Sequence, residues 1–195
     1  TEKSNEIDTS PQVIEALVTS LIENGVREKD IILYDASRVV GDKLYHPVHE
    51  KYSEVRFVDS EGGKGRTQAK VDSSSPLYFK EQGLRSFYLP QSVIEAEYLI
   101  NLANLKKHSL AGITLTAKNH FGSIYDTSYE SWTPRALHSS ISTRNNKPGQ
   151  PNPLVNIIGH KDLGGKTVLY LIDALYGGMN QQSVEPVPWD MSPFK

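Results

Sequence analysis

Histidine and lysine side chains gather in one short segment, residues 101–122, which reads NLANLKKHSLAGITLTAKNHFG. A histidine titrates near neutral pH, so His108 could transfer a proton if it lies in a cleft. Lys118 could bind a carboxylate or phosphate, or act as a covalent amine if it is removed from water. Alternatively, His108 caps the loop and Lys118 extends along the surface. Three further polar residues of the segment could contact a ligand: Lys107, Thr114 and Asn119.

The elements around this segment suggest where these side chains lie. The apolar run Glu95–Leu102 predicts a buried strand, and the cations follow it in a polar turn. Apolar residues then recur at helical spacing: Leu110, Ile113, Ala117 and Phe121. Loops between a strand and a helix bind ligands in open α/β sheets, because helix N-termini offer unpaired N–H groups and a positive dipole end. The segment therefore predicts binding of an anion.

Polar groups also follow two other predicted strands. Ile31–Tyr34 is followed by Asp35 and Arg38, and Thr167–Leu175 carries Asp173 near its end. If these strands run parallel, their carboxyl ends meet at one edge of the sheet, where side chains can hold a ligand or a metal ion. Either carboxylate could instead cap the next helix.

A glycine-rich loop is a further candidate anion site. Residues 59–66 read DSEGGKGR, and their backbone N–H groups with Lys64 and Arg66 could surround a phosphate or carboxylate. The spacing matches neither a P-loop nor a dinucleotide fingerprint, so an ordinary flexible loop is the alternative.

The composition limits the class of protein. The 195 residues suffice for one domain, and the net charge of −2 leaves no cationic excess for nucleic-acid binding. Without cysteine, the chain ligates no iron–sulfur cluster through thiolates and forms no disulfide. We find no membrane-spanning run, and the compartment stays open. The start at Thr1 favours a fragment of a longer chain, whose other parts could complete the site.

The element pattern predicts an α/β fold with a mainly parallel sheet flanked by helices. Ser10, Pro11 and the apolar stripe that follows predict a first helix, which stops at Asn24-Gly25. Four runs should share one sheet and be covered on both faces: Ile31–Tyr34, Val55–Val58, Tyr98–Leu102 and Val168–Ile172.

A long excursion follows the predicted central helix. Residues 123–153 are rich in serine, threonine, asparagine and proline, which offer little apolar surface to offset the entropy of ordering. Long connections of this kind are usually functional lids or disordered. We expect a mobile flap over the site that lies outside the core and brings His138 in when it closes.

Three segments together resemble one protein family. They are TSPQVIEALVTSLIENGV near the start, INLANLKKHSLAGITLTAKNHFG in the middle and KTVLYLIDALYGG near the end. The resemblance is to domain of unknown function family 362, and it spans most of the chain. It implies a prokaryotic α/β protein, with relatives that are in some cases fused to ferredoxin-like iron–sulfur modules, and it assigns no general activity.

A more remote likeness is to the nickel-dependent lactate racemase family. His108, Ala111–Gly112 and Lys118 reproduce the spacing of a segment of that family. The likeness implies a proton-transferring base at His108, a cofactor-holding Lys118 and nickel or another divalent metal, for which His138 is the nearest ligand candidate. Asp173 is a further candidate metal ligand because of its place at the end of a predicted strand. The serine-glycine-glycine-arginine run of the racemase is replaced here by residues 114–117, which puts its cofactor in doubt.

Two classes of function remain open from the sequence. The first is an enzyme in which His108 transfers a proton and Lys118 and Lys107 hold an anionic substrate or nucleotide, with a metal-assisted or redox-associated reaction. The second is a binding module with the same cleft, without catalysis, that serves an iron–sulfur partner protein. The sequence does not decide whether the chain is an enzyme.

Overall fold

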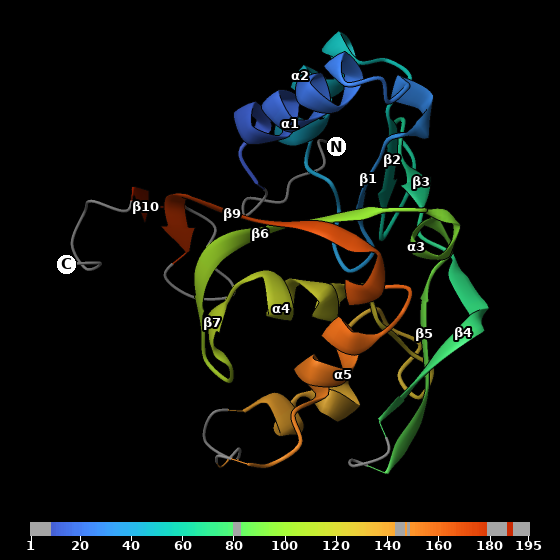
Figure 1. Ribbon diagram of the computed structural model, residues 1–195, viewed down its shortest axis with the longest axis vertical. Helices are drawn as coiled ribbons and strands as arrows, with labels where there is room; N and C mark the ends of the chain where they lie inside the picture. The colour runs from blue at the N-terminus through green and yellow to red at the C-terminus, as the bar shows by residue number, and fades with distance from the viewer. Residues whose placement is uncertain (1–8, 80–82, 143–146, 148, 179–186, 189–195) are drawn as a thin grey trace.

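The computed structural model is an α/β protein and describes residues 9–79, 83–142, 147, 149–178 and 187–188 (Figure 1). Its strands are β1 (Ile32–Asp35), β2 (Arg56–Asp59), β3 (Thr67–Gln68), β4 (Val71–Phe79), β5 (Leu84–Pro90), β6 (Leu99–His108), β7 (Gly112–Thr114), β8 (Tyr125–Asp126), β9 (Thr167–Gly178) and β10 (Val187–Pro188). Its α-helices are α1 (Pro11–Glu23), α2 (Asp42–Lys51), α3 (Gln91–Glu95), α4 (Thr116–Asn119) and α5 (Pro153–Gly159). Short 3-10 turns are η1 (Glu28–Asp30), η3 (His120–Ser123), η4 (Arg135–Leu137), η5 (Ser139–Ile141) and η6 (Gly164–Lys166).

The first helix and the first parallel strand pair follow the sequence prediction. Pro11 starts α1, and the helix ends before Gly25, whose φ of +96° lies in the left-handed region that favours glycine. Helices α1 and α2 lie together at one end of the molecule, next to the parallel pair β1–β2 (Figure 1). Ile14, Val18 and Phe57 are buried in the core between them.

The prediction that four strands share one sheet is wrong. Strands β1 and β2 pair in parallel, and so do β6 and β9, but the two pairs belong to different sheets. Each pair completes its hydrogen bonding with its own neighbours, which are β3 for the first pair and β7 and β10 for the second. A third sheet, β4-β5-β8, is antiparallel. The molecule is therefore a mixed α/β fold with local parallel pairing.

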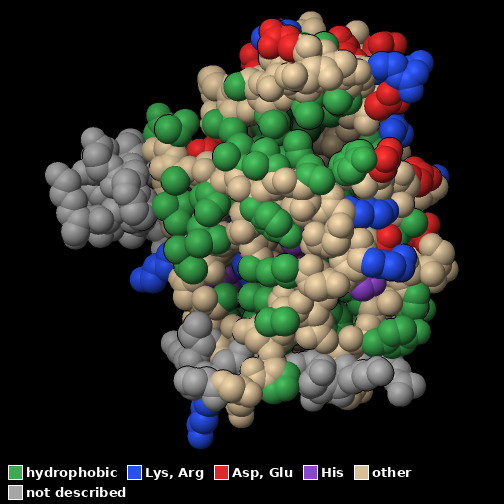
Figure 2. All heavy atoms as spheres, in the orientation of Figure 1, with side chains coloured by type: hydrophobic (Ala, Val, Ile, Leu, Met, Phe, Trp, Pro, Cys, Tyr) green, Lys and Arg blue, Asp and Glu red, His purple; other side chains and the backbone are tan. Residues whose placement is uncertain are grey.

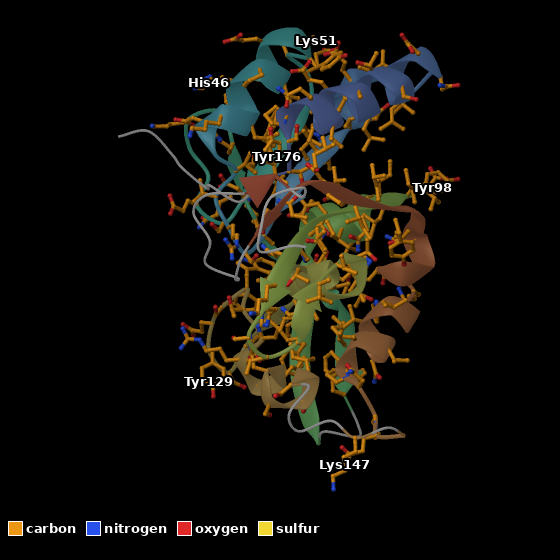
Figure 3. All side chains as sticks on the ribbon, turned by 90° about the vertical axis from the view of Figure 1, so that its left-hand side faces the viewer. His46, Lys51, Tyr98, Tyr129, Lys147 and Tyr176 are labelled. Atoms are coloured by element: carbon orange, nitrogen blue, oxygen red, sulfur yellow. The ribbon has the colours of Figure 1, made fainter. Side chains whose placement is uncertain are left out.

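The expectation that the apolar strands are covered on both faces also fails for β9. Val168 and Leu175 are 64% and 62% exposed. Hydrophobic side chains are visible over the region where β6 and β9 run side by side (Figure 2). Tyr98, just before β6, and Tyr176, late in β9, lie toward the two ends of this strand pair (Figure 3). A continuous apolar run thus marks a strand without guaranteeing its burial.

Part of the long excursion is in the core. Ile124 and Leu137 are fully buried and Ile141 is 3% exposed, in one cluster with Phe79 and Leu89. The expected position outside the core is wrong for these residues, because a few well-spaced apolar side chains suffice to anchor a polar segment. Residues 143–146 and 148 lie outside the described part of the chain. Closure of a flap stays a prediction.

Candidate functional site

The basic residues of the central segment lie on a strand and not in a loop. Strand β6 continues to His108, and the chain then turns back into β7, with His108 opposite Gly112 and Lys106 opposite Thr114. Gly112 has a φ of +77°, which suits this tight turn. The helix that apolar spacing predicted from Leu110 onward is therefore wrong over its first half. Helical structure begins only at Thr116.

Strand geometry decides which cations converge. Alternate residues of a strand point to the same face, so Lys106 and His108 share one face while Lys107 points to the other and is exposed. The charge of Lys106 lowers the pKa of both His108 and Lys118. Lys107 thus points away from Lys106 and His108. Lys106 takes its place, and alternation within a strand extended to His108 would have identified it.

We call five residues the cationic cluster: Arg38, Lys106, His108, Lys118 and His138. Each either influences the pKa of another member or has its own pKa influenced by one, so they lie close in space although they come from four segments. In Figure 2, basic and histidine side chains are visible, set back among hydrophobic ones, where β6 and α4 lie in Figure 1.

Lys118 is the central cation of this cluster. Burial lowers its pKa to about 8, and the nearby charges of Lys106 and Arg38 act in the same direction. Its Nζ lies 4.1 Å from the ring centroid of Phe121, which is buried. A cation over an aromatic face is stabilised, but less than by a carboxylate partner. The described residues provide Lys118 with no ion pair.

His108 is neutral and its tautomer is determined by its hydrogen bonds. Backbone N–H groups of Leu110 and Ala111 donate to its Nδ1, at 3.1 and 3.2 Å. Nδ1 therefore carries a lone pair and the ring proton is on Nε2. Burial, followed by the charges of Lys118, His138 and Lys106, lowers the pKa to about 4. His108 caps the turn and presents an N–H group.

His138 has the opposite tautomer. Its Nδ1 lies 3.0 Å from the carbonyl oxygen of Pro134, which can only accept, so Nδ1 carries the proton and Nε2 has a lone pair. Its ring packs edge-on against Phe121, with the ring centroids 5.2 Å apart. Burial lowers its pKa, and the hydrogen bond to Pro134 partly offsets this effect. The free nitrogen of His138 can act as a base at neutral pH.

The loop after β1 lies next to this cluster. Tyr34 and Ser123 share a hydrogen bond of 2.8 Å, and a Cβ at Gly122 would lie 2.9 Å from Ser37 Oγ. These contacts place Arg38 near Lys118. Asp35 itself holds the loop, because its Oδ1 accepts hydrogen bonds from the backbone N–H groups of residues 37 and 38 and from the hydroxyl of Ser37.

Asp173 has a structural role. It lies within β9, where its carboxylate accepts the backbone N–H groups of Ser10 at 2.9 Å and Leu175 at 3.2 Å. The described part of the chain contains no group of three or more histidine, aspartate or glutamate residues placed to hold a metal. The described residues, which include His138 and Asp173, therefore do not fit the nickel site that the racemase likeness implies.

The basic side chains of the glycine-rich loop lie next to carboxylates of the protein itself. Arg66 is 5% exposed, and its guanidinium donates to Asp42 at 2.6 Å and lies over the ring of Tyr45. Lys64 is 3.8 Å from the same Asp42 carboxylate. Asp59 accepts backbone N–H groups within the loop at residues 61 and 62. The predicted ligand site in this loop stays a prediction, and Arg66 already has an anionic partner within the fold.

Two further candidates differ in what they contact. Asn119 Nδ2 donates to Asn101 Oδ1 at 3.0 Å and to the Leu102 carbonyl at 3.1 Å, and so ties α4 to β6. Thr114 is 7% exposed, and its hydroxyl has no hydrogen-bond partner in the described structure. A buried hydroxyl without a partner is uncommon and costs free energy. Thr114, opposite Lys106, is thus available to a ligand.

Comparison with known proteins identifies the family. The family model described as domain of unknown function (DUF362) matches residues 1–192. The chain belongs to this family. No curated protein and no solved structure matches it, so the likeness to lactate racemase stays a prediction. Among the described residues, no helix is both long and apolar enough to cross a membrane. The expected iron–sulfur partner also stays a prediction.

Proposed function

We propose that this DUF362 domain binds a small anionic molecule at the cationic cluster and transfers a proton to or from it. The observation that carries the proposal is Lys118, a largely buried cation beside Lys106 and Arg38, without an ion pair in the described structure. Like charges that are brought together away from water destabilise the folded protein. A bound anion removes this cost, and the hydroxyl of Thr114 can donate to it.

The two histidines supply complementary groups for proton transfer. His138 Nε2 has a lone pair and can accept a proton, whereas His108 Nε2–H can donate a hydrogen bond to an oxygen of the ligand. Their lowered pKa values keep both rings neutral at pH 7. This assignment reverses the role expected for His108, since its Nδ1 is occupied and its Nε2 already carries a proton.

The test is a sulfate titration followed by amide NMR at low ionic strength. We expect shifts of the backbone amides of β7 and α4, and binding at least about tenfold weaker in Lys118→Ala, since a buried charge pair is lost. Lys51→Ala is the matched control, because it removes one lysine charge from α2, at the far end of the molecule (Figure 3). Equal affinities of the two variants would contradict the proposal.

Proton transfer needs a separate measurement. Once a ligand with an exchangeable C–H bond is bound, an enzyme should exchange that hydrogen with solvent deuterium, and His138→Gln should abolish the exchange while sulfate still binds. Anion binding without any exchange would instead favour a binding module.

A further inference from the structure

Anion binding leaves the chemistry of Lys118 unused. A lysine that only attracts an anion is most effective when its ammonium group is fully charged and in contact with water. Lys51, whose side chain is exposed, is an example of such a lysine. Lys118 instead lies against Phe121, close to two other cations, and the part of the chain that the structure describes brings no carboxylate into an ion pair with it. This environment is typical of an amine that reacts as a nucleophile.

We propose that Lys118 forms a Schiff base with an anionic carbonyl compound, a 2-oxo carboxylate, held in the cationic cluster. This inference rests on the proposed anion site and names its substrate class. Phe121 contacts both groups, because the Lys118 amine lies over its ring and the His138 ring packs edge-on against it, so the nucleophile and a base adjoin the same side chain.

The shape of a 2-oxo carboxylate fits the arrangement of charges. Its carboxylate lies next to the carbonyl carbon, so an amine that attacks this carbon must have cationic neighbours within reach of the carboxylate. Lys106 and Arg38 are the cations whose charges act on Lys118. Thr114, opposite Lys106 on β7, can donate its unpartnered hydroxyl to the same carboxylate. A carbonyl compound without the acid would leave these groups unused.

The reaction is balanced within the site. The neutral amine of Lys118 adds to the carbonyl carbon, a C–N bond forms and the C–O π pair moves to oxygen, which accepts a hydrogen bond from His108 Nε2–H. His138 Nε2 takes the proton that Lys118 loses to become a neutral amine and gives it to this oxygen, which becomes a hydroxyl. It then takes a second proton from the new ammonium nitrogen and gives it to the hydroxyl, so the C–O bond breaks, water leaves and an iminium ion joins ligand and lysine. Nothing is oxidised or reduced.

The test is reductive trapping of the whole chain with pyruvate and sodium cyanoborohydride, followed by mass spectrometry of the intact protein and of its peptides. Hydride adds to the iminium carbon and leaves a stable secondary amine, so the mass should rise by that of pyruvic acid less one oxygen atom. We expect the adduct on Lys118, formed at least about tenfold faster than on the exposed Lys107, because more of its amine is neutral near pH 7. Adducts spread evenly over the exposed lysines would overturn the proposal.

Two variants separate this inference from anion binding. Lys118→Arg keeps the positive charge and should still bind sulfate, but it cannot form an imine and should lose the adduct. Lys107→Arg should keep both. Sulfate binding without trapping on Lys118 in the wild type would overturn the Schiff base and leave the anion site standing. If the wild-type protein bound no sulfate, that result would overturn the proposed function itself.

Discussion

Two cations of this protein, the buried Arg66 and the half-buried Lys118, illustrate how the surroundings of a residue decide its role. Arg66 lies against Asp42 at 2.6 Å and over Tyr45, so its charge is balanced within the fold. Lys118 has an aromatic ring and two repelling cations instead. A paired buried charge contributes to structure, whereas one without a counter-ion is available for a ligand or for reaction.

Sulfate binding should weaken as the pH rises through about 8, which is the pKa of Lys118. Protonated lysine attracts the anion and neutral lysine does not, so affinity should fall by up to about tenfold for each pH unit above 8. Sulfate itself does not titrate in this range. NMR titrations at pH 7, 8 and 9 would measure the effect, and Lys118→Arg should show a nearly flat profile. A flat wild-type profile would contradict the low pKa.

Stability should fall as the pH drops from about 6.5 toward 4, in part because of His120. This side chain is 3% exposed, and burial lowers its pKa to about 4. The His120 side chain binds a proton more tightly in the unfolded chain than in the folded protein, so acid favours unfolding. The free energy of unfolding should fall by about 2 kcal/mol between pH 8 and pH 5 from this group. His120→Phe keeps the ring contact with Tyr170 and removes the titrating group. Urea unfolding at both pH values should show a smaller loss in the variant than in the wild type.

At the scale of elements, β6 shows why the site residues were only partly predictable. Apolar runs identified the parallel partners β6 and β9, but a helical spacing of apolar residues obscured the β6–β7 hairpin. In a short segment, the spacing of apolar residues is compatible both with a helix and with a turn followed by a strand. The hairpin places Lys106 on the face of His108, and it is the backbone pairing that decides this.

The junction of α5 and η6 offers an element-scale prediction. A Cβ at Gly164 would lie 1.7 Å from the backbone carbonyl oxygen of Ile158, which is rigid, so Gly164→Ala should cost about 1–3 kcal/mol. Gly159→Ala, at the end of α5, is the control, because a Cβ there meets no atom within 4 Å. Thermal unfolding of the two variants should differ clearly. Similar melting temperatures would show that the backbone at this junction can shift to accommodate the added Cβ at little cost in stability.

On the scale of the whole molecule, a few polar contacts connect parts that are distant in sequence. Asp173 in β9 accepts the backbone N–H of Ser10 at the start of α1, and Tyr34 in β1 is hydrogen-bonded to Ser123. These contacts link α1 and the β1 sheet to the β6–β9 pair and to the turn after α4. The position of Arg38 beside Lys118 thus depends on the assembly of the whole domain.

The long excursion supplies the prediction at this scale. Leu137 is fully buried in the main core cluster, so Leu137→Ala should lower the free energy of unfolding by about 2–5 kcal/mol. Tyr129, in the same segment, is 54% exposed and lies at the end of the molecule away from α2 (Figure 3), so Tyr129→Ala should change it by less than about 0.5 kcal/mol. Chemical denaturation would measure both. A small effect at Leu137 would restore the idea of a detached flap.

The sequence by itself determined the family, the α/β class and the first helix, and it singled out His108 and Lys118, which the structure brings close together. Composition, caps and apolar runs are local properties, and they were sufficient for these conclusions. The tertiary structure alone decided that Arg66 meets Asp42, that Asp173 accepts the backbone N–H of Ser10 and that Lys106, not Lys107, shares a face with His108. It also separated the strands into different sheets and buried Leu137. The physical reason is that pairing, burial and charge balance depend on neighbours far along the chain, which no local pattern specifies.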